Sequence, residues 1–253
     1  MNRTPAAVRL HSFIYRSSRR LADLVLASVG LLLLAPLLLL TGLLICVLQG
    51  WPPLYLEPRL GQHRRPFTLI KFRTLTNNHD KNNTKPGTSV AALDDPRLRP
   101  LGRWLRRTHL DELPQLLNII AGHMSLVGPR PLKPAHAACL PADKLLSLLS
   151  VRPGLTGADA IAFMAEDGVL VGHTADPQRA EAIYLQYLLP AKADLQLAYV
   201  RQRCWRLDLQ LLARTIGACL SPAAYASSAA QLRRLLPADD AHITYNRRPH
   251  NYQ

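Results

Sequence analysis

Residues 31–40 read Leu-Leu-Leu-Leu-Ala-Pro-Leu-Leu-Leu-Leu, and they lie in the middle of residues 24–56, a stretch without any Asp, Glu, Lys or Arg. Helices in the core of a soluble protein rarely stay uncharged for so long. As one straight helix, this stretch would measure about 50 Å, against the roughly 30 Å of a bilayer's hydrocarbon core. The sequence therefore predicts a membrane segment that is too long for a simple perpendicular crossing.

Pro36 divides this membrane segment into two halves. Proline lacks a backbone N–H and clashes with the preceding helical turn, so it kinks or breaks a helix. The halves, residues 24–35 and 37–48, would each measure about 18 Å, which is too short to span. A re-entrant helix, which enters and leaves the bilayer by the same face, accommodates both halves. A kinked single span is the alternative, because proline is tolerated in spanning helices.

Basic residues flank the membrane segment on both sides. Arg16, Arg19 and Arg20 precede it, and Arg59, Arg64, Arg65, Lys71 and Arg73 follow it. Because Lys and Arg collect on the cytoplasmic side of membrane segments, two basic flanks favour the re-entrant course, with both ends in the cytoplasm. A cleaved signal peptide is disfavoured, since the apolar run is too long and no small-residue cleavage site follows it.

The whole chain has 253 residues and a net charge of +14, an excess that suggests anionic partners such as phosphates, acidic lipids or nucleic acid. We divide it into a basic N-terminus with the membrane segment at residues 1–56, a globular domain at 57–220 and a C-terminal tail at 221–253. The four cysteines lack the Cys-x-x-Cys spacing of a zinc site, so we expect free thiols.

The globular domain is predicted to be mainly helical with a short β segment. Residues 66–75 alternate as a strand does, with Lys71 and Arg73 on one face. Helices are expected at residues 97–107, at 111–120, at 141–150, from about 176 until Pro190 ends the helix, and once or twice within 191–217. Residues 76–96 indicate a binding loop or lid. Beyond Ser221 no clear periodicity appears, and we expect partial disorder.

The densest group of reactive side chains is the stretch Arg106–Gln115, which contains the adjacent acids Asp111 and Glu112. One interpretation is structural, because Thr108 and Asp111 have the spacing of a helix capping box and acids favour helix N-termini. The other is chemical, because a carboxylate can hold a divalent metal or attack phosphorus. Spacing alone leaves both open.

Cations that could receive phosphate oxygens lie elsewhere in the chain. Arg130 stands between two prolines in Gly128-Pro129-Arg130-Pro131, so its backbone has little freedom, and a guanidinium fork matches oxyanion geometry. The glycines of Arg152–Gly157 could expose backbone N–H groups to an anion. Acids and several cations beside a membrane segment fit phosphoryl transfer at the bilayer surface.

At these residues the chain resembles the bacterial polyprenyl-phosphate phosphosugar transferases, the monotopic enzymes that start surface-glycan assembly. The matching stretches, in the family's order, are Pro66-Phe67 with Lys71-Phe72-Arg73, Leu101-Gly102-Arg103, Asp111–Gln115 with Asn118, Met124–Pro131, Arg152–Gly157, and finally Tyr184, Pro190, Lys192, Tyr199 and Asp208. The resemblance covers roughly residues 15–217, and its ordered motifs favour the chemical interpretation of Asp111.

The resemblance implies a fold, a reaction and a location. It implies a cytoplasmic catalytic domain on a re-entrant helix in the bacterial inner membrane, with the site at the cytoplasmic face among membrane lipids. Asp111 would attack the β-phosphorus of a UDP-sugar and release UMP, and the covalent phosphosugar would pass to polyprenyl phosphate. Glu112 would complete a dyad that, with Asp111, holds Mg²⁺. Phosphates would bind Arg130, with Arg106, Lys71 and Arg73 as helpers.

The chain also departs from the family's pattern. Ala35 replaces a common Ser before the helix-breaking proline, Arg64 replaces a Gly, and His123 replaces an Asp. Ala158-Asp159 replaces a more apolar pair after Thr156-Gly157. The change at Ala35 bears on the re-entrant helix, because a Ser hydroxyl could satisfy a backbone carbonyl freed by the proline. The other three changes leave the dyad intact, so they bear on which sugar is used rather than on the reaction.

Two other functions fit the composition less well. A non-enzymatic membrane-anchored scaffold would not need the intact Asp111-Glu112 pair. A nucleic-acid-binding protein would fit the charge, but the sequence has no nucleic-acid motif and only 6% aromatic residues, so we expect no nucleic acid as partner. The identity of the sugar and the oligomeric state, a homodimer included, stay open.

Overall fold

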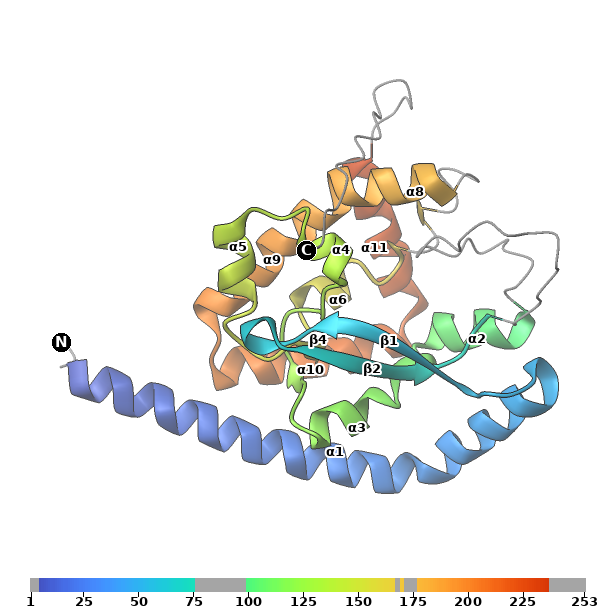
Figure 1. Cartoon of the computed structure of the whole chain (residues 1–253), viewed down its shortest axis with the longest axis horizontal. Coiled ribbons are helices and arrows are strands. Elements are labelled where there is room, and N and C mark those ends of the chain that lie inside the picture. Colours follow the sequence, from blue (N-terminus) through green and yellow to red (C-terminus); the bar gives the residue numbers. More distant parts are fainter. Residues whose placement is uncertain (1–4, 76–98, 167–168, 171–176, 237–253) are drawn as a thin grey trace, which may run out of the picture.

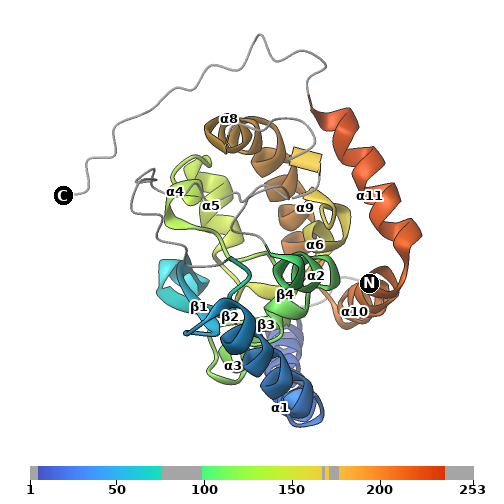
Figure 2. The same cartoon turned by 90° about the vertical axis from the view of Figure 1, so that its right-hand side faces the viewer.

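The computed structural model of the chain describes residues 5–75, 99–166, 169–170 and 177–236. The predicted loop or lid at residues 76–96 lies outside these residues. A long N-terminal helix, α1 (Pro5–Gln49), runs along the lower edge of the molecule in Figure 1, and the rest of the described chain lies above this helix. Seen nearly end-on, α1 forms the base beneath two short sheets and the surrounding helices (Figure 2).

The helix α1 is continuous through Pro36 and curves around the base of the molecule (Figure 1). It has two different faces. Ala27 and Ile45 are fully buried against the globular part, while Leu32 and Leu39 on the other face are each 76% exposed. Exposed leucines continue along this second face at Leu33, Leu40, Leu43 and Leu44. The predicted apolar membrane segment is therefore one side of a single helix, and its re-entrant course stays a prediction.

Buried polar groups fix α1 to the globular part. The Asp23 carboxylate accepts hydrogen bonds from the Ser125 hydroxyl (2.7 Å) and the Leu126 amide (2.9 Å). Arg20 donates to the carbonyls of Ile119 (2.8 Å) and Ile120 (3.2 Å), at the end of the next-layer helix α3 (Gln115–Ile120). These contacts satisfy carbonyls that a helix C-terminus leaves without a partner inside the helix.

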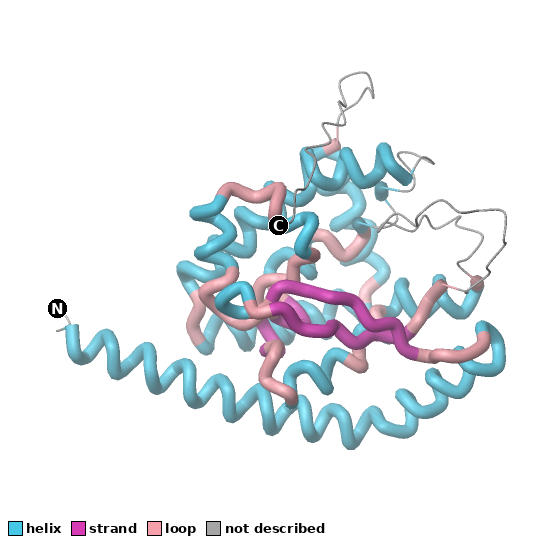
Figure 3. Tube along the Cα trace, in the orientation of Figure 1, coloured by secondary structure: helices cyan, strands magenta, loops and turns pink. Residues whose placement is uncertain are grey.

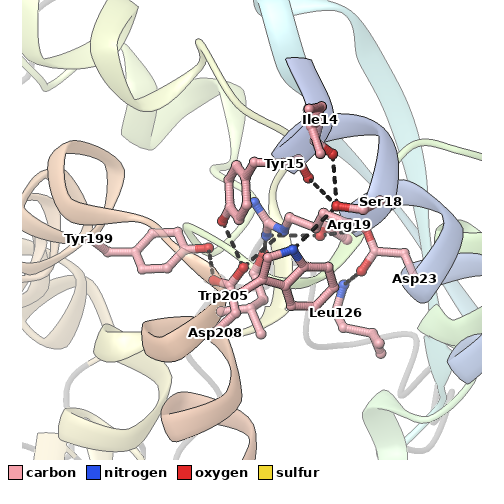
Figure 4. Close-up of polar contacts among 11 residues, drawn as sticks. Ile14, Tyr15, Ser18, Arg19, Asp23, Leu126, Tyr199, Trp205 and Asp208 are labelled. Carbon is pink, nitrogen blue, oxygen red and sulfur yellow. Dashed lines mark hydrogen bonds and ion pairs between the residues drawn. The ribbon is translucent and has the colours of Figure 1, made fainter. Parts of the chain in front are cut away.

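A second set of contacts joins the start of α1 to the C-terminal helices. Arg19 pairs with Asp208 at 3.3 Å and donates to the Ser125 hydroxyl and the Val127 carbonyl. The hydroxyls of Tyr15 and Tyr199 donate to the two Asp208 oxygens, each at 2.7 Å (Figure 4). The charges that flank the apolar run thus hold α1 in a fixed register on the domain.

The predicted strand at residues 66–75 is confirmed as β2 (Pro66–Phe72), which pairs antiparallel with β1 (Leu54–Leu60). The link between them contains η1 (Gln62–Arg64), a short 3-10 turn. Figure 3 shows this hairpin as the longer of the two strand pairs, surrounded by helices. The buried ring of Phe67 packs toward α1 and α3, and that of Phe72 packs with Ile45 and Leu105. The strand ends before Arg73, which lies in the following loop.

The second sheet brings two separate motifs together. Strand β3 (Ser125–Val127) pairs in parallel with β4 (Gly154–Thr156). A Cβ on Gly154 would lie 2.1 Å from the backbone nitrogen of Gly128, so both positions need glycine. The Gly154 N–H donates to the Pro129 carbonyl at 2.8 Å. These glycines therefore hold the two loops together, and the Gly154 N–H is not available to an anion.

Helices form most of the remaining fold. They are α2 (Pro100–Thr108), α4 (Pro134–Ala137), α5 (Ala142–Leu148), α6 (Ala158–Ala162), α8 (Pro177–Ile183), the π-helical η3 (Tyr184–Leu188), α9 (Leu189–Gln202), α10 (Trp205–Leu220) and α11 (Pro222–Leu235). Their largest core includes Leu148, Leu170, Ile183 and Leu188. The predictions for 97–107, 141–150 and 191–217 agree with α2, α5 and the pair α9–α10.

One expectation for the C-terminal half was wrong. Pro190 does not end a helix, because it lies in the first turn of α9, where its missing N–H costs little, directly after the π-helical η3. The first part of the predicted tail forms α11, which packs Leu232 into the main core with 1% exposure, and residues 237–253 lie outside the described residues. The start of α11 has a recognisable signal, since Ser221 caps the helix and Pro222 takes a first-turn position.

Candidate functional site

The adjacent acids lie on a short 3-10 turn rather than at the start of a long helix. Helix α2 ends at His109, which has the left-handed φ of 55°, and η2 (Leu110–Glu112) follows at once. The Thr108 hydroxyl donates back to the Trp104 carbonyl at 2.8 Å, so it does not cap the next helix. Thr108 and Asp111 therefore do not form a capping box, and the structural interpretation of Asp111 is not supported. The predicted helix 111–120 is confirmed only from Gln115 onward.

Glu112 is paired with Arg130 through both oxygens. One guanidinium nitrogen donates to Glu112 Oε2 at 3.1 Å, and the other pairs with Oε1. Arg130 follows β3, whose register against β4 is fixed by the Gly128–Gly154 contact. A bidentate pair of this kind fixes the direction of the guanidinium fork. The structure therefore pairs Glu112 with Arg130, a contact that their spacing in the sequence did not predict.

Asp111 and Glu112 line a cavity of about 970 Å³ together with several cations. Lys71 reaches it from β2, Arg103 and Arg106 from α2, and Arg130 from the loop after β3. Arg106 also donates to the Thr74 hydroxyl at 2.9 Å. Asp111 is only 8% exposed, and none of the described residues forms a hydrogen bond or ion pair with its carboxylate. It is a buried carboxylate free to react.

The two acids titrate in opposite directions. Burial, followed by the negative charge of Glu112, raises the pKa of Asp111 to about 7, although Lys71, Arg106 and Arg130 oppose the shift. Burial also raises the pKa of Glu112, but Arg130 outweighs it and lowers that pKa to about 2. Neighbouring carboxylates whose environments separate their pKa values in this way are typical of sites that assign different roles to two acids.

This raised pKa predicts a pH-dependent effect of Asp111→Asn on stability. Between pH 4 and pH 7 the folded chain keeps a proton on Asp111 that the unfolded chain has lost, so this group's contribution to stability falls as pH rises through that window. The variant removes the penalty. Without metal, we expect it to exceed wild type in unfolding free energy by on the order of 1–2 kcal/mol at pH 8, with the gap closing toward pH 4.

Chemical denaturation of the full chain in detergent at pH 4, 6 and 8, with a chelator present, measures this gap. Asp143→Asn is the matched control, because Asp143 is exposed on α5 and should give no pH-dependent difference. A gap that is the same at all three pH values would contradict the burial of an ionisable carboxylate at position 111.

Arg73 does not join the other predicted phosphate-binding residues. It is 4% exposed and does not line the cavity. Its guanidinium donates to the carbonyls of Gln49 (2.8 Å) and Trp51 (3.3 Å), and to that of Gly50 between them. These are the orphan acceptors at the C-terminus of α1. The residue therefore holds the end of the long helix, and strand alternation alone could not reveal this.

This position predicts that Arg73→Ala destabilises the protein. The buried Gln49 contact and two part-buried contacts, to Gly50 and Trp51, would lose their donor, so we expect a loss of about 1–3 kcal/mol in unfolding free energy. Chemical denaturation in detergent measures it. Arg99→Ala is the control, because Arg99 donates to the Leu48 carbonyl at an exposed site and should cost less than about 0.5 kcal/mol. Equal stability of the two variants would contradict this role for Arg73.

Sequence reasoning missed a second polar group in the same cavity. Asp159, Glu166, Lys192 and Gln196 all line it, and Lys192 pairs with Glu166. Lys192 was noted in the resemblance without a role, and Asp159 only as a departure from it. Asp159 lies on α6, whereas Lys192 and Gln196 lie on α9, so no local spacing could have brought Asp159 together with them.

The residues present fit the magnesium ion that the resemblance implies. Within the described ranges no cluster of three or more His, Cys, Asp or Glu side chains could form a metal site made of protein alone. Mg²⁺ in phosphoryl-transfer sites is usually held by one or two carboxylates, by waters and by substrate phosphates. Asp111 offers one free carboxylate, and Glu112 is already occupied by Arg130.

Comparison with known proteins finds a family and several relatives. A family described as bacterial sugar transferase matches residues 14–222. The chain is 34% identical over 208 residues to a UDP-glucose:undecaprenyl-phosphate glucose-1-phosphate transferase of Caulobacter vibrioides, covering 80% of this chain and 70% of that protein. It is 36% identical over 174 residues to the exopolysaccharide production protein PSS of Rhizobium leguminosarum, covering 65% of this chain and 80% of that protein.

A longer relative matches in part. The UDP-glucose:undecaprenyl-phosphate glucose-1-phosphate transferase of Escherichia coli is 36% identical over 154 residues, which cover 58% of this chain and 31% of that protein. The family match, over residues 14–222, includes the stretch that carries the acids and cations of the cavity.

Proposed function

Because the chain belongs to the bacterial sugar transferase family, we propose that it transfers a sugar 1-phosphate from a UDP-sugar to polyprenyl phosphate and releases UMP. The observation that carries this proposal is the buried carboxylate of Asp111. It has no hydrogen-bond or ion-pair partner among the described residues, and it lines a cavity together with Lys71, Arg106 and Arg130. Relatives named as undecaprenyl-phosphate glucose-1-phosphate transferases support the same reaction.

The proposed reaction has two displacements at phosphorus. In the first, an Asp111 oxygen attacks the β-phosphorus of the UDP-sugar, the bond to the bridging oxygen breaks, and UMP leaves with that electron pair. In the second, a phosphate oxygen of the polyprenyl carrier attacks the same phosphorus, and the bond to Asp111 breaks. The product is a diphosphate-linked sugar and the Asp111 carboxylate is restored. Covalent catalysis of this kind divides one difficult displacement into two.

The cations of the cavity would stabilise the charge that spreads over the phosphoryl oxygens. Both ends of the Arg130 fork donate to Glu112, so Arg130 would bind a phosphate through its remaining N–H groups, or through the fork once Glu112 turns toward the metal. Lys71 and Arg106 supply further positive charge from neighbouring elements. When bound through Asp111 and, after some rearrangement, Glu112, Mg²⁺ would add Lewis-acid neutralisation of the diphosphate.

The faces of α1 support a monotopic position at the membrane. Its buried positions extend from Asp23 to Gln49, about 39 Å along a helix, and they contact the globular domain rather than lipid. A single span would pass about 20 apolar residues through the hydrocarbon core, and a water-soluble domain packed along them would be drawn into that core. We therefore favour a re-entrant or surface-embedded course over a single span. Basic flanks on both sides support our proposal that the domain lies at the cytoplasmic face of the inner membrane.

The exposed leucines of α1 predict how membrane binding can be lost. A double variant, Leu32→Glu with Leu39→Glu, puts two charges on the face that we expect to enter lipid, at a cost of about 2–3 kcal/mol each. We expect the full chain to leave the membrane fraction in vesicle flotation. The control is Leu146→Glu, which is 58% exposed on α5, on the far side of the molecule from α1 (Figures 1 and 2). A double variant that still floats with the vesicles would contradict the proposed membrane face.

The test of the proposed function is UMP release from the purified full chain in detergent with Mg²⁺, polyprenyl phosphate and each of a panel of UDP-sugars. We expect one or a few UDP-sugars to release UMP, and the lipid product to carry the sugar on a diphosphate. Folded protein that releases no UMP from any of them would favour a non-enzymatic scaffold instead. An exopolysaccharide pathway, named for one relative, is the setting in which the first such product would be used.

A further inference from the structure

The second polar group of the cavity has a carboxylate with one oxygen left over. Asp159 on α6 is 1% exposed, and its Oδ2 accepts a hydrogen bond from Gln196 Nε2 at 2.7 Å. Its Oδ1 is buried and has no hydrogen-bond partner within the described part of the chain. A buried carboxylate oxygen without a donor is costly, so a fold that keeps one usually has a use for it.

This carboxylate lies close to the loop that carries Arg130. A Cβ on Gly157 would lie 3.0 Å from Asp159 Oδ1 and 2.4 Å from the Gly128 carbonyl oxygen, two residues before Arg130. Asp159 and Arg130 line the same cavity, and the charge of Asp159 adds to that of Glu112 in raising the pKa of Arg130. Arg130 is therefore the common neighbour of the catalytic dyad and of the second polar group. If Arg130 holds a phosphate of the donor, the parts of the donor next to that phosphate come within reach of Asp159.

The neighbours of Asp159 already supply positive charge. The Lys192 ammonium pairs with Glu166 and lies 5.3 Å from the centre of the Tyr184 ring and 5.5 Å from that of Phe163. Burial nevertheless raises the pKa of Asp159, although Lys192 and the Gln196 hydrogen bond oppose the shift, so a further donor to the free oxygen would stabilise the carboxylate. Both groups that flank a UDP-sugar's diphosphate, the sugar and the ribose, carry hydroxyls. A hydroxyl both donates and accepts, so a diol can use an acceptor and an ammonium together.

We propose that Asp159, oriented by Gln196, accepts a hydrogen bond from a carbohydrate hydroxyl of the UDP-sugar. This inference rests on the proposed function. A site built to bind a hydroxyl rejects the analogue that lacks it, because the buried acceptor is then left without a partner.

The test combines substrate analogues with variants. The best UDP-sugar from the panel is compared with analogues that lack one hydroxyl, either on the hexose or at the 2′ or 3′ position of the ribose. In wild type, loss of the contacted hydroxyl should lower kcat/KM by about 10²-fold or more. In Asp159→Ala the same loss should cost less than about 3-fold, since the acceptor is already gone. The responding position tells whether the contacted hydroxyl belongs to the sugar or to the ribose.

Two further variants keep the test decisive. Asp143→Ala, at an exposed acid on α5, should behave as wild type with every analogue. If Asp159→Ala fails to fold, as thermal unfolding in detergent would show, Asp159→Asn keeps the shape but has one acceptor oxygen in place of two. It can accept from Gln196 or from the hydroxyl but not from both, so it should show the same coupling with a smaller factor.

Two outcomes would overturn the inference, and they are distinguishable. If every hydroxyl deletion costs the same factor in wild type and in the Asp159 variants, then Asp159 contacts no hydroxyl, and an ordered water or the fold alone accounts for it. If wild type releases no UMP from any UDP-sugar, the proposed function fails, and this inference fails with it.

Discussion

Asp111→Asn is expected to reduce UMP release by at least about 10³-fold, the scale of losing a covalent nucleophile. The amide has nearly the same shape as the carboxyl, and it would remove an uncompensated charge from a buried position, so the variant should fold at least as well as wild type. What it loses is an oxygen that can form a bond to phosphorus and later leave. The effect should therefore appear in kcat rather than in donor binding.

The covalent intermediate gives this prediction a second measurement. Wild type incubated with a labelled UDP-sugar, without polyprenyl phosphate, should retain label on the protein after denaturation, and Asp111→Asn should retain none. Asp143→Asn is the control and should keep full activity and labelling. If Asp111→Asn releases UMP at more than a few per cent of the wild-type rate, and mass spectrometry shows that the Asn has not deamidated to Asp, the nucleophile assignment is wrong.

Arg130→Ala is expected to lower kcat/KM by about 10²–10³-fold, as removal of one preorganised charge-stabilising group typically does. The stability effect should be small by comparison. Because 39% of the Arg130 side chain is exposed, we expect a loss of about 1–2 kcal/mol in unfolding free energy, less than the 3–5 kcal/mol of fully buried pairs. A large kinetic effect with a modest change in stability would distinguish substrate contact from a structural role.

Arg130→Lys separates charge from geometry. A lysine keeps the positive charge but cannot make the two parallel contacts that Arg130 makes with Glu112, so its activity should fall between wild type and Arg130→Ala. Arg107→Ala provides a control at another arginine that lines the cavity, and should cost less than about 10-fold. Full activity in Arg130→Ala would remove Arg130 from the proposed phosphate site.

Sequence analysis predicted those features that depend on local composition. The strand at β2 and the apolar run of α1 follow from short stretches of sequence. Asp111, Glu112 and Arg130 were assigned to one site through the family resemblance, because spacing alone left the role of Asp111 open. All three line the cavity, as do Lys71 and Arg106.

Features that depend on distant partners could not be predicted in this way. Arg73 looks like a free cation in its own strand, but its guanidinium meets the end of a helix that lies more than 20 residues earlier. Pro190 has the appearance of a helix stop, and only the preceding π-helical turn makes it a helix start. Asp159 meets Gln196 across 37 residues, and no periodicity connects them.

The two-sided character of α1 has a kinetic consequence. In the proposed monotopic arrangement, a helix held by the domain on one side and in contact with lipid on the other would keep Asp111 at a constant height above the lipid. Enzyme and lipid carrier would then find each other by lateral diffusion in two dimensions. Turnover should scale with the number of carriers per unit of membrane area, and diluting the carrier with inert lipid should slow the enzyme even when its amount per volume is constant.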